Sequence, residues 1–149
     1  MRKLFILLII AFFVVGCEEH SEKKQVISSP NAPKAIGPYS QAIQVDNMLY
    51  LAGQLGIDPA TGKFAGEDFE SQARQALTNL KAVIEHAGFS LEDVVQCQVF
   101  VTDLENYKGF NEIYKEFFKK DFPARAVLEV SRIPADGLIE IMMVAVKAD

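Results

Sequence analysis

The chain of 149 residues has no tryptophan, and it has only two cysteines and two histidines. Cys17 belongs to an N-terminal signal described below, so Cys97 is left without a partner for an intramolecular disulfide. A single cysteine with His20 and His86 does not make a metal-ligand cluster. The sequence therefore predicts neither a disulfide framework nor a metal centre. Cys97 lies in a segment of alternating apolar residues, 94–101, where it is interpreted as a small core residue.

An excess of basic residues is also missing. Lys and Arg number 15 against 20 Asp and Glu, which gives a formal net charge of −5. The phosphates of nucleic acids attract a basic stripe or patch, and the lysine pairs at 23–24 and 119–120 are too small to form one. We therefore expect no nucleic-acid partner.

The N-terminal segment resembles the signal of a bacterial lipoprotein. Two basic residues precede an apolar run, 4–15, which is shorter than the roughly 20 residues of a membrane-spanning helix. The run ends in Val-Val-Gly before Cys17, and the residues that follow are polar. This pattern predicts that a signal peptide, 1–16, is removed, that Cys17 carries the lipid, and that 17–29 is a flexible tether.

Such a signal implies a membrane-anchored protein of the cell envelope that faces the periplasm. Glu18 takes the place of the aspartate often found in inner-membrane lipoproteins, which mildly favours the outer membrane. Three alternatives stay open: an ordinary secretory signal, a short membrane anchor, or a cytoplasmic protein if the signal is not processed. The rest of the chain, 30–149, has the length of one domain.

Hydrophobic periodicity predicts both helices and strands. Apolar residues at spacings of three and four predict two helices, over 69–87 and 103–118, and the aromatic residues of the second helix are interpreted as core. Apolar segments bounded by turn residues predict five strands, over 39–45, 48–53, 94–101, 126–130 and 138–146. The order ββαβαββ is typical of an α+β domain with two helices on one face of a sheet.

The last predicted strand, 138–146, is apolar at nearly every position, which predicts that both of its faces are buried. Two helices can cover only one face of the sheet. We therefore expect the chain to associate through the other face into a closed homo-oligomer.

Two charged residues interrupt these apolar strands. Arg125 begins one strand, and Glu140 lies in the last one. Charges in a buried strand are costly unless they pair or bind a ligand. Because arginine can hold a carboxylate with two parallel hydrogen bonds, the two residues indicate a small-molecule site. A structural ion pair, within the fold or between subunits, explains the same pattern, and the residue types alone leave both interpretations open.

Several separate motifs over 30–147 together resemble one protein family. In chain order they are Asn31-Ala-Pro-Lys-Ala-Ile-Gly-Pro-Tyr-Ser-Gln41, Gly53-Gln54, Gln72-Ala-Arg-Gln-Ala-Leu-Thr-Asn-Leu80, Val99-Phe-Val-Thr-Asp-Leu104, Phe110-Asn111, Phe122-Pro-Ala-Arg125 and Ile139-Glu-Ile141. With these motifs the chain resembles the RidA branch of the YjgF-like family, the reactive intermediate (enamine/imine) deaminases.

The resemblance implies a chorismate-mutase-like fold, with a six-stranded mixed sheet and two helices on one face. It also implies a barrel-like homotrimer with sites at the clefts between subunits. The implied reaction is hydrolysis of short 2-imino acids and their enamine tautomers, such as 2-iminopropanoate and 2-iminobutanoate, to 2-oxo acids and ammonia. The resemblance implies no metal and no organic cofactor.

The site residues of the family have counterparts in this chain. By resemblance, Arg125 clamps the substrate carboxylate, and Glu140 activates the attacking water and passes its proton to the leaving ammonia. Tyr39 and Asn111 are expected in the pocket, and the backbone of Gly53 is expected to border it. If Glu140 lies beside Arg125, the pKa of its carboxyl group should be lowered.

Two positions depart from the family pattern. Val127 stands where a cysteine is usual, two residues after the arginine, and Ala52 stands where a serine often precedes the glycine. Both changes remove polar groups, which supports a second hypothesis, a non-catalytic module that binds small carboxylates. A third hypothesis, a surface or chaperone-like protein, has support only from the predicted tether.

Overall fold

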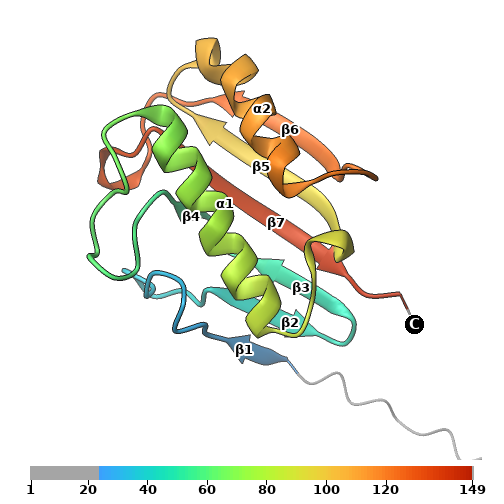
Figure 1. Cartoon of the computed structure of the whole chain (residues 1–149). Coiled ribbons are helices and arrows are strands. Elements are labelled where there is room, and N and C mark those ends of the chain that lie inside the picture. Colours follow the sequence, from blue (N-terminus) through green and yellow to red (C-terminus); the bar gives the residue numbers. More distant parts are fainter. Residues whose placement is uncertain (1–23, 149) are drawn as a thin grey trace, which may run out of the picture.

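A seven-stranded mixed sheet covered by two helices forms the domain (Figure 1). The structure, a computed structural model, describes residues 24–148. The strands run in the order β1-β2-β3-β7-β5-β6. The short strand β4 also pairs with β7, near its N-terminal end, whereas β3 pairs near its C-terminal end. The strand bounds are β1 Gln25–Ile27, β2 Ala42–Val45, β3 Met48–Leu51, β4 Gln54–Leu55, β5 Val94–Val101, β6 Ala124–Glu129 and β7 Ile139–Val146.

Both helices, α1 (Phe69–His86) and α2 (Tyr107–Phe117), lie on the same face of the sheet (Figure 1). The strands β5 and β6 are parallel, so the chain must cross over between them, and α2 is that crossover. The strand β7 lies between β3 and β5 and is antiparallel to both. The predicted α+β class and the predicted positions of both helices are therefore confirmed.

The sequence of α1 provides a cap at each end and a buried stripe between them. The Asp68 carboxylate accepts a hydrogen bond from Ser71 N (2.8 Å), and this bond lowers the pKa of Asp68. At the other end Gly88 adopts a φ of 77°, and Phe89 N donates to Ile84 O (3.0 Å). The stripe that faces the sheet includes Ala73, Ala76, Leu77, Leu80, Val83 and Ile84.

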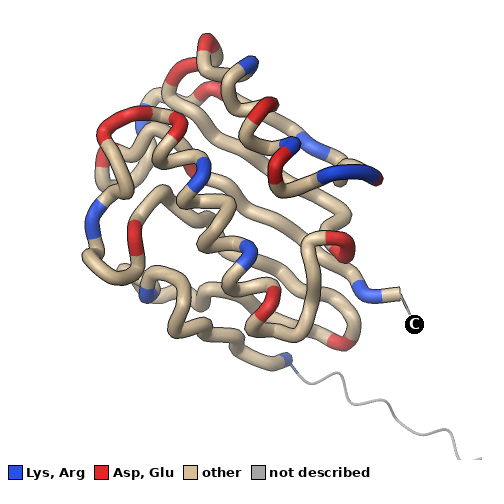
Figure 2. Tube along the Cα trace, viewed as in Figure 1, with Lys and Arg blue, Asp and Glu red and all other residues tan. Residues whose placement is uncertain are grey.

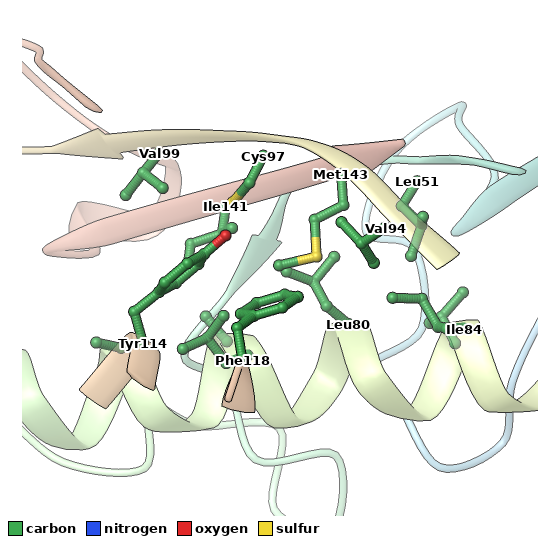
Figure 3. Close-up of a cluster of buried hydrophobic side chains, with 14 of the residues drawn as sticks. Leu51, Leu80, Ile84, Val94, Cys97, Val99, Tyr114, Phe118, Ile141 and Met143 are labelled. Atoms are coloured by element: carbon green, nitrogen blue, oxygen red, sulfur yellow. The ribbon is translucent and has the colours of Figure 1, made fainter. Parts of the chain in front are cut away.

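The strand β7 shows how the core divides the sheet into two faces. Its odd-numbered residues, 139–145, are buried, and they pack with the side chains of the helices in one cluster (Figure 3). Its even-numbered residues, 140–146, are half-exposed. The sequence predicted burial of both faces, but within one chain only the helix-facing side is buried. The opposite face of the sheet therefore presents partly apolar surface.

Two boundaries differ from the expectation. The strand β1 lies in the predicted tether and pairs with β2, with Val26 opposite Ile43, so the fold includes residues before the predicted domain start at 30. The first strand after the loop begins at Ala42, because Tyr39 belongs to a bend. The predicted signal peptide and the lipid site at Cys17 lie outside the described residues. Within residues 24–148, no helix is long and apolar enough to cross a membrane.

Candidate functional site

Arg125, near the start of β6, is held by one face of α2. Its Nη2 donates to Asn111 Oδ1 (2.5 Å). Its Cζ lies 4.5 Å from the ring centroid of Tyr114, 5.3 Å from that of Phe110 and 5.7 Å from that of Tyr107. These four helix residues recur at spacings of three and four, so they share one face of α2. The guanidinium thus rests among three rings that stabilise a cation, which we call the Arg125 cage.

The Arg125 cage modifies the expectation that the aromatic residues of α2 are only core. Phe110 and Tyr114 are buried, as predicted. Tyr107 is exposed, so it is not a core residue. All three rings also lie close enough to the guanidinium of Arg125 to stabilise its charge. The stripe therefore both packs against the sheet and supports the guanidinium.

A cavity of about 830 Å³ opens beside Arg125. Its walls come from the turn before α2, α2 itself, the loop after it and β6, and they include Leu104, Phe122 and Val127. In the part of the chain that the structure describes, no carboxylate forms an ion pair with Arg125. A guanidinium without a carboxylate partner at the wall of a cavity can bind a carboxylate from solution with paired hydrogen bonds.

Glu140 does not share this cavity. On β5, Cys97 is the register partner of Arg125, and Phe100 is the register partner of Glu140. Because side chains alternate between the two faces of a sheet, positions three residues apart point to opposite faces. Arg125 therefore lies on the helix side, and Glu140 lies on the open side. Within one chain they form neither a common site nor the intramolecular ion pair that the residue types had left open.

Glu140 borders a second cavity of about 320 Å³, together with Ile36, Tyr39 and Gly53. A Cβ atom on Gly53 would lie 1.9 Å from Glu140 Oε1, so glycine is what lets the carboxylate approach this stretch of backbone. Two of the predicted site residues, Tyr39 and Gly53, are thus brought together with Glu140. Asn111, the fourth predicted pocket residue, is with Arg125 instead.

A register shift next to Gly53 creates this approach. Tyr50 lies opposite Val144, whereas Gln54 lies opposite Ile141. The segment from Tyr50 to Gln54 therefore advances four residues while β7 advances three, so the connection between β3 and β4 contains one extra residue. Bulges of this kind bend the strand and re-aim the neighbouring side chains.

The pKa of Glu140 is raised, because burial penalises the charged form of its carboxyl group. The lowered pKa expected from the sequence requires Arg125 as a near neighbour of Glu140. The arginine lies on the other face of the sheet, so within one chain its charge does not offset the burial of Glu140.

One positioning residue, Gln41, was not singled out from the sequence. It is buried, its Oε1 accepts from Ser29 N (2.5 Å), and its Nε2 donates to Pro33 O (2.7 Å). These bonds fasten the proline-rich loop that carries Tyr39. A buried glutamine directly after a loop is a weak signal in a sequence, because only its partners distinguish it from a surface residue.

We expect Glu140→Gln to make the fold more stable at neutral pH and to leave its stability unchanged in acid. A carboxyl group with a raised pKa in the folded chain stabilises the fold fully only below its unfolded pKa, about 4.3. This contribution is lost as the pH rises through the raised pKa, and the neutral amide escapes the loss. Urea denaturation on both sides of this range measures the difference. Exposed Glu67→Gln is the control, and equal effects of the two substitutions would contradict the expectation.

Comparison with known proteins extends over most of the chain. Residues 29–147 match the family model described as Endoribonuclease L-PSP. A RutC family protein of Pyrococcus horikoshii is 50% identical over 124 residues, which cover 83% of this chain and 98% of that protein. The 2-iminobutanoate/2-iminopropanoate deaminase of Capra hircus is 41% identical over 124 residues, which cover 83% of this chain and 90% of that protein.

Solved structures agree with these relatives. The yjgF gene product of E. coli has 42% sequence identity and a TM-score of 0.80, and the match covers 83% of this chain and 99% of that chain. The mixed sheet with two helices and the family suggested by the motifs are thus both confirmed. The chain belongs to the RidA/YjgF family, which the Endoribonuclease L-PSP model describes.

Proposed function

We propose that this protein hydrolyses short 2-imino acids and their enamine tautomers, such as 2-iminopropanoate and 2-iminobutanoate, to 2-oxo acids and ammonia, without a metal or an organic cofactor. The observation that carries the proposal is the guanidinium of Arg125, held by Asn111 and the three rings beside an open cavity and free of any carboxylate partner within residues 24–148. The name of the Capra hircus relative supports this substrate class.

The chemistry needs little beyond orientation and one base. Every 2-imino acid has a carboxylate next to the reacting carbon, so a carboxylate held on Arg125 fixes the position of that carbon. The protonated C=N carbon is already electrophilic, and water is a sufficient nucleophile once a base takes its proton. General-base catalysis of this kind contributes typically about 10²–10⁴-fold.

In the proposed mechanism, Glu140 takes a proton from water while the water oxygen forms a bond to the iminium carbon. The product of this step is a neutral carbinolamine. The carboxyl group of Glu140 then gives the proton to the amine nitrogen. As the C–N bond breaks, the hydroxyl proton passes to the carboxylate and from there to the departing ammonia, so a 2-oxo acid and ammonium leave and the Glu140 carboxylate is restored. Burial raises the pKa of Glu140 within one chain, and the guanidinium of the neighbouring subunit opposes this shift, so the carboxylate stays ionised and available as the base.

Two copies of the chain are needed for one complete site. Arg125 and Glu140 lie on opposite faces of the same sheet, so a small substrate cannot reach both within one chain. We propose that the open sheet face mediates a homotrimer, in which the Arg125 cavity of one subunit meets the Glu140 cavity of the next. Exposed Tyr50 and Leu128 give this face the apolar character that an interface between subunits requires.

The description of the family model as an endoribonuclease finds no support in the charges of this chain. Acidic and basic residues are interspersed along the elements, as Figure 2 shows, and the net charge is −5. At the mouth of the Arg125 cavity, Lys115 is already paired with Glu112 (2.9 Å). The described residues therefore form no basic stripe that could bind the phosphate backbone of RNA.

A binding module for small carboxylates is the second candidate. It is favoured by Val127, which brings an apolar group into the Arg125 cavity, and by the separation of Arg125 from Glu140 in one chain. Such a module would hold a 2-oxo acid or an amino acid on Arg125 without turnover.

We further propose that the protein is anchored in the cell envelope through a lipid on Cys17. The proposal rests on the apolar run, the residues before Cys17 and the polar stretch after it. The first described strand, β1, begins at Gln25, so the polar stretch between Cys17 and the sheet is short.

The deaminase proposal predicts that the protein competes with semicarbazide for imines. An amino-acid oxidase generates 2-iminopropanoate or 2-iminobutanoate, and semicarbazone formation is followed with and without the protein. Wild type should slow it, Arg125→Ala should abolish the effect, and Glu140→Gln should weaken it by about 10²-fold or more. A folded wild type that slows neither reaction would exclude deamination of short imines, and binding of 2-oxobutanoate would then favour the binding module.

The shared-site proposal predicts complementation between two inactive variants. Arg125→Ala and Glu140→Ala are co-expressed with different tags, and mixed oligomers are purified through both tags. Every mixed trimer of this kind has both intact residues at one of its three sites, so about a third of wild-type activity should return. Each variant alone is the control. Full activity in either single variant, or none in mixed oligomers, would rule out a site shared in this way.

The anchoring proposal predicts that Cys17 is the attachment point of the lipid. In a bacterial host fed radiolabelled palmitate, the wild-type protein should carry label and sediment with membranes. Cys17→Ala should carry no label, whereas Cys97→Ala should be labelled normally. Equal labelling of the wild type and Cys17→Ala would disprove the anchor.

A further inference from the structure

Tyr114 carries a buried hydroxyl group that makes no hydrogen bond of regular geometry within residues 24–148, although the Cys97 thiol is close enough to interact with it. The residue is only 3% exposed, and its hydroxyl points toward the thiol of Cys97 (Figure 3). A buried donor left unpaired is costly, and phenylalanine would fill nearly the same volume without that cost. The hydroxyl group therefore calls for an explanation other than packing.

The position of this hydroxyl relates it to Arg125. Of the three rings in the Arg125 cage, that of Tyr114 lies nearest, 4.5 Å from Arg125 Cζ. Cys97 is the register partner of Arg125 on β5, and it is fully buried. The hydroxyl and the thiol thus lie together next to Arg125, and Tyr114 also lines the cavity beside it.

Neither group can act as a base or nucleophile at ordinary pH. Burial raises the pKa of the Cys97 thiol to about 11, and burial also raises the pKa of the Tyr114 hydroxyl. The positive charge of Arg125 lowers both pKa values, so it opposes the effect of burial and lies close enough to act on both groups. Both stay neutral, so they can influence the site only as dipoles and by contact.

We propose that Tyr114 is a positioning residue for Arg125 and that Cys97 supports it. The ring of Tyr114 lies against the guanidinium, and its O–H, directed at the thiol sulfur, a weak acceptor, keeps the ring in this position. Asn111 holds one edge of the guanidinium, and the ring of Tyr114 packs against it. The other edge is then presented to the carboxylate of a ligand in a fixed orientation.

This arrangement gives a role to a cysteine that first looked like a simple core residue. Val127, two residues after Arg125 on the same face of β6, offers no polar atom to the cation. On the neighbouring strand, Cys97 offers one at the register position of Arg125 itself. The polar support therefore comes from β5 and α2 and not from β6.

The test separates affinity from turnover and from stability, and its activity arm rests on the proposed deaminase function. Full-length protein is titrated with 2-oxobutanoate by calorimetry, and KM and kcat are measured with 2-iminobutanoate. Tyr114→Phe keeps the ring and removes the oxygen. We expect Kd and KM to rise roughly three- to tenfold, the change expected from one hydrogen-bond-sized contact. The value of kcat should change little, and the melting temperature should not fall.

Two further variants distinguish the proposal from a loss of packing. Cys97→Ala should weaken binding of 2-oxobutanoate in the same direction, and Cys97→Ser, which restores an acceptor, should recover most of the affinity. Thr78→Val is the control, because it removes a hydroxyl group of similar size, which donates to Arg74 O (2.8 Å) on the exposed side of α1. It should leave the Kd unchanged.

Each outcome decides the question. A wild-type Kd in Tyr114→Phe, whatever its melting temperature, would mean that the hydroxyl has no positioning role. Failure of the wild type to bind 2-oxobutanoate would also overturn the proposal, because Arg125 would then not be a carboxylate site. If the wild type binds 2-oxobutanoate but hydrolyses no imine, the deaminase proposal fails alone, and the calorimetric comparison still decides the role of Tyr114.

Discussion

The pairing register of β5 with its two neighbours is the constraint on which the rest of the structure depends. The strand is parallel to β6 and antiparallel to β7, and it aligns Arg125 with Cys97 and Glu140 with Phe100. The parallel pair requires the α2 crossover, which brings Asn111 and the three rings over Arg125. The odd separation of the two alignments sends the cation and the carboxylate to opposite faces. A shift of one residue in the pairing of β5 with β6 would move Arg125 to the open face of the sheet. The same shift in the pairing of β5 with β7 would move Glu140 to the face under the helices.

Both charged side chains, Arg125 and Glu140, are partly removed from water, and the fold compensates this cost differently for each of them. Arg125 keeps its charge next to rings and a neutral amide, which stabilise a cation without neutralising it. Glu140 has no such support, and its raised pKa reports the cost. A buried counter-charge would have stabilised either residue more simply, but it would also have occupied the position that a ligand needs. The fold therefore leaves both charges available.

The layers of the fold could be predicted from the sequence because the periodicities of 69–87, 103–118 and 94–101 each point to one type of element. The resemblance of the motifs supplied Arg125, Glu140, Tyr39, Gly53 and Asn111. What could not be predicted is how these residues divide between two faces, because that depends on which β5 residue each strand pairs with. The strand β1 was also missed, because three residues in a polar stretch form a strand only when β2 offers an edge. The roles of Gln41 and Tyr114 come from contacts that no local pattern encodes.

The open sheet face connects the two charges to the energetics of association. Apolar residues such as Tyr50, Leu128 and Met142 lie on the same face as Glu140, and burying them between copies would provide the driving force for assembly. In the proposed trimer, the same event brings the carboxylate of one chain to the arginine of another. A single chain can form its core without either step, because the helices already cover the other face. Folding and completion of the site are then separate equilibria, and only the second depends on protein concentration. Substitutions on the open face can therefore remove activity and leave the core intact, whereas substitutions under α1 and α2 act on both.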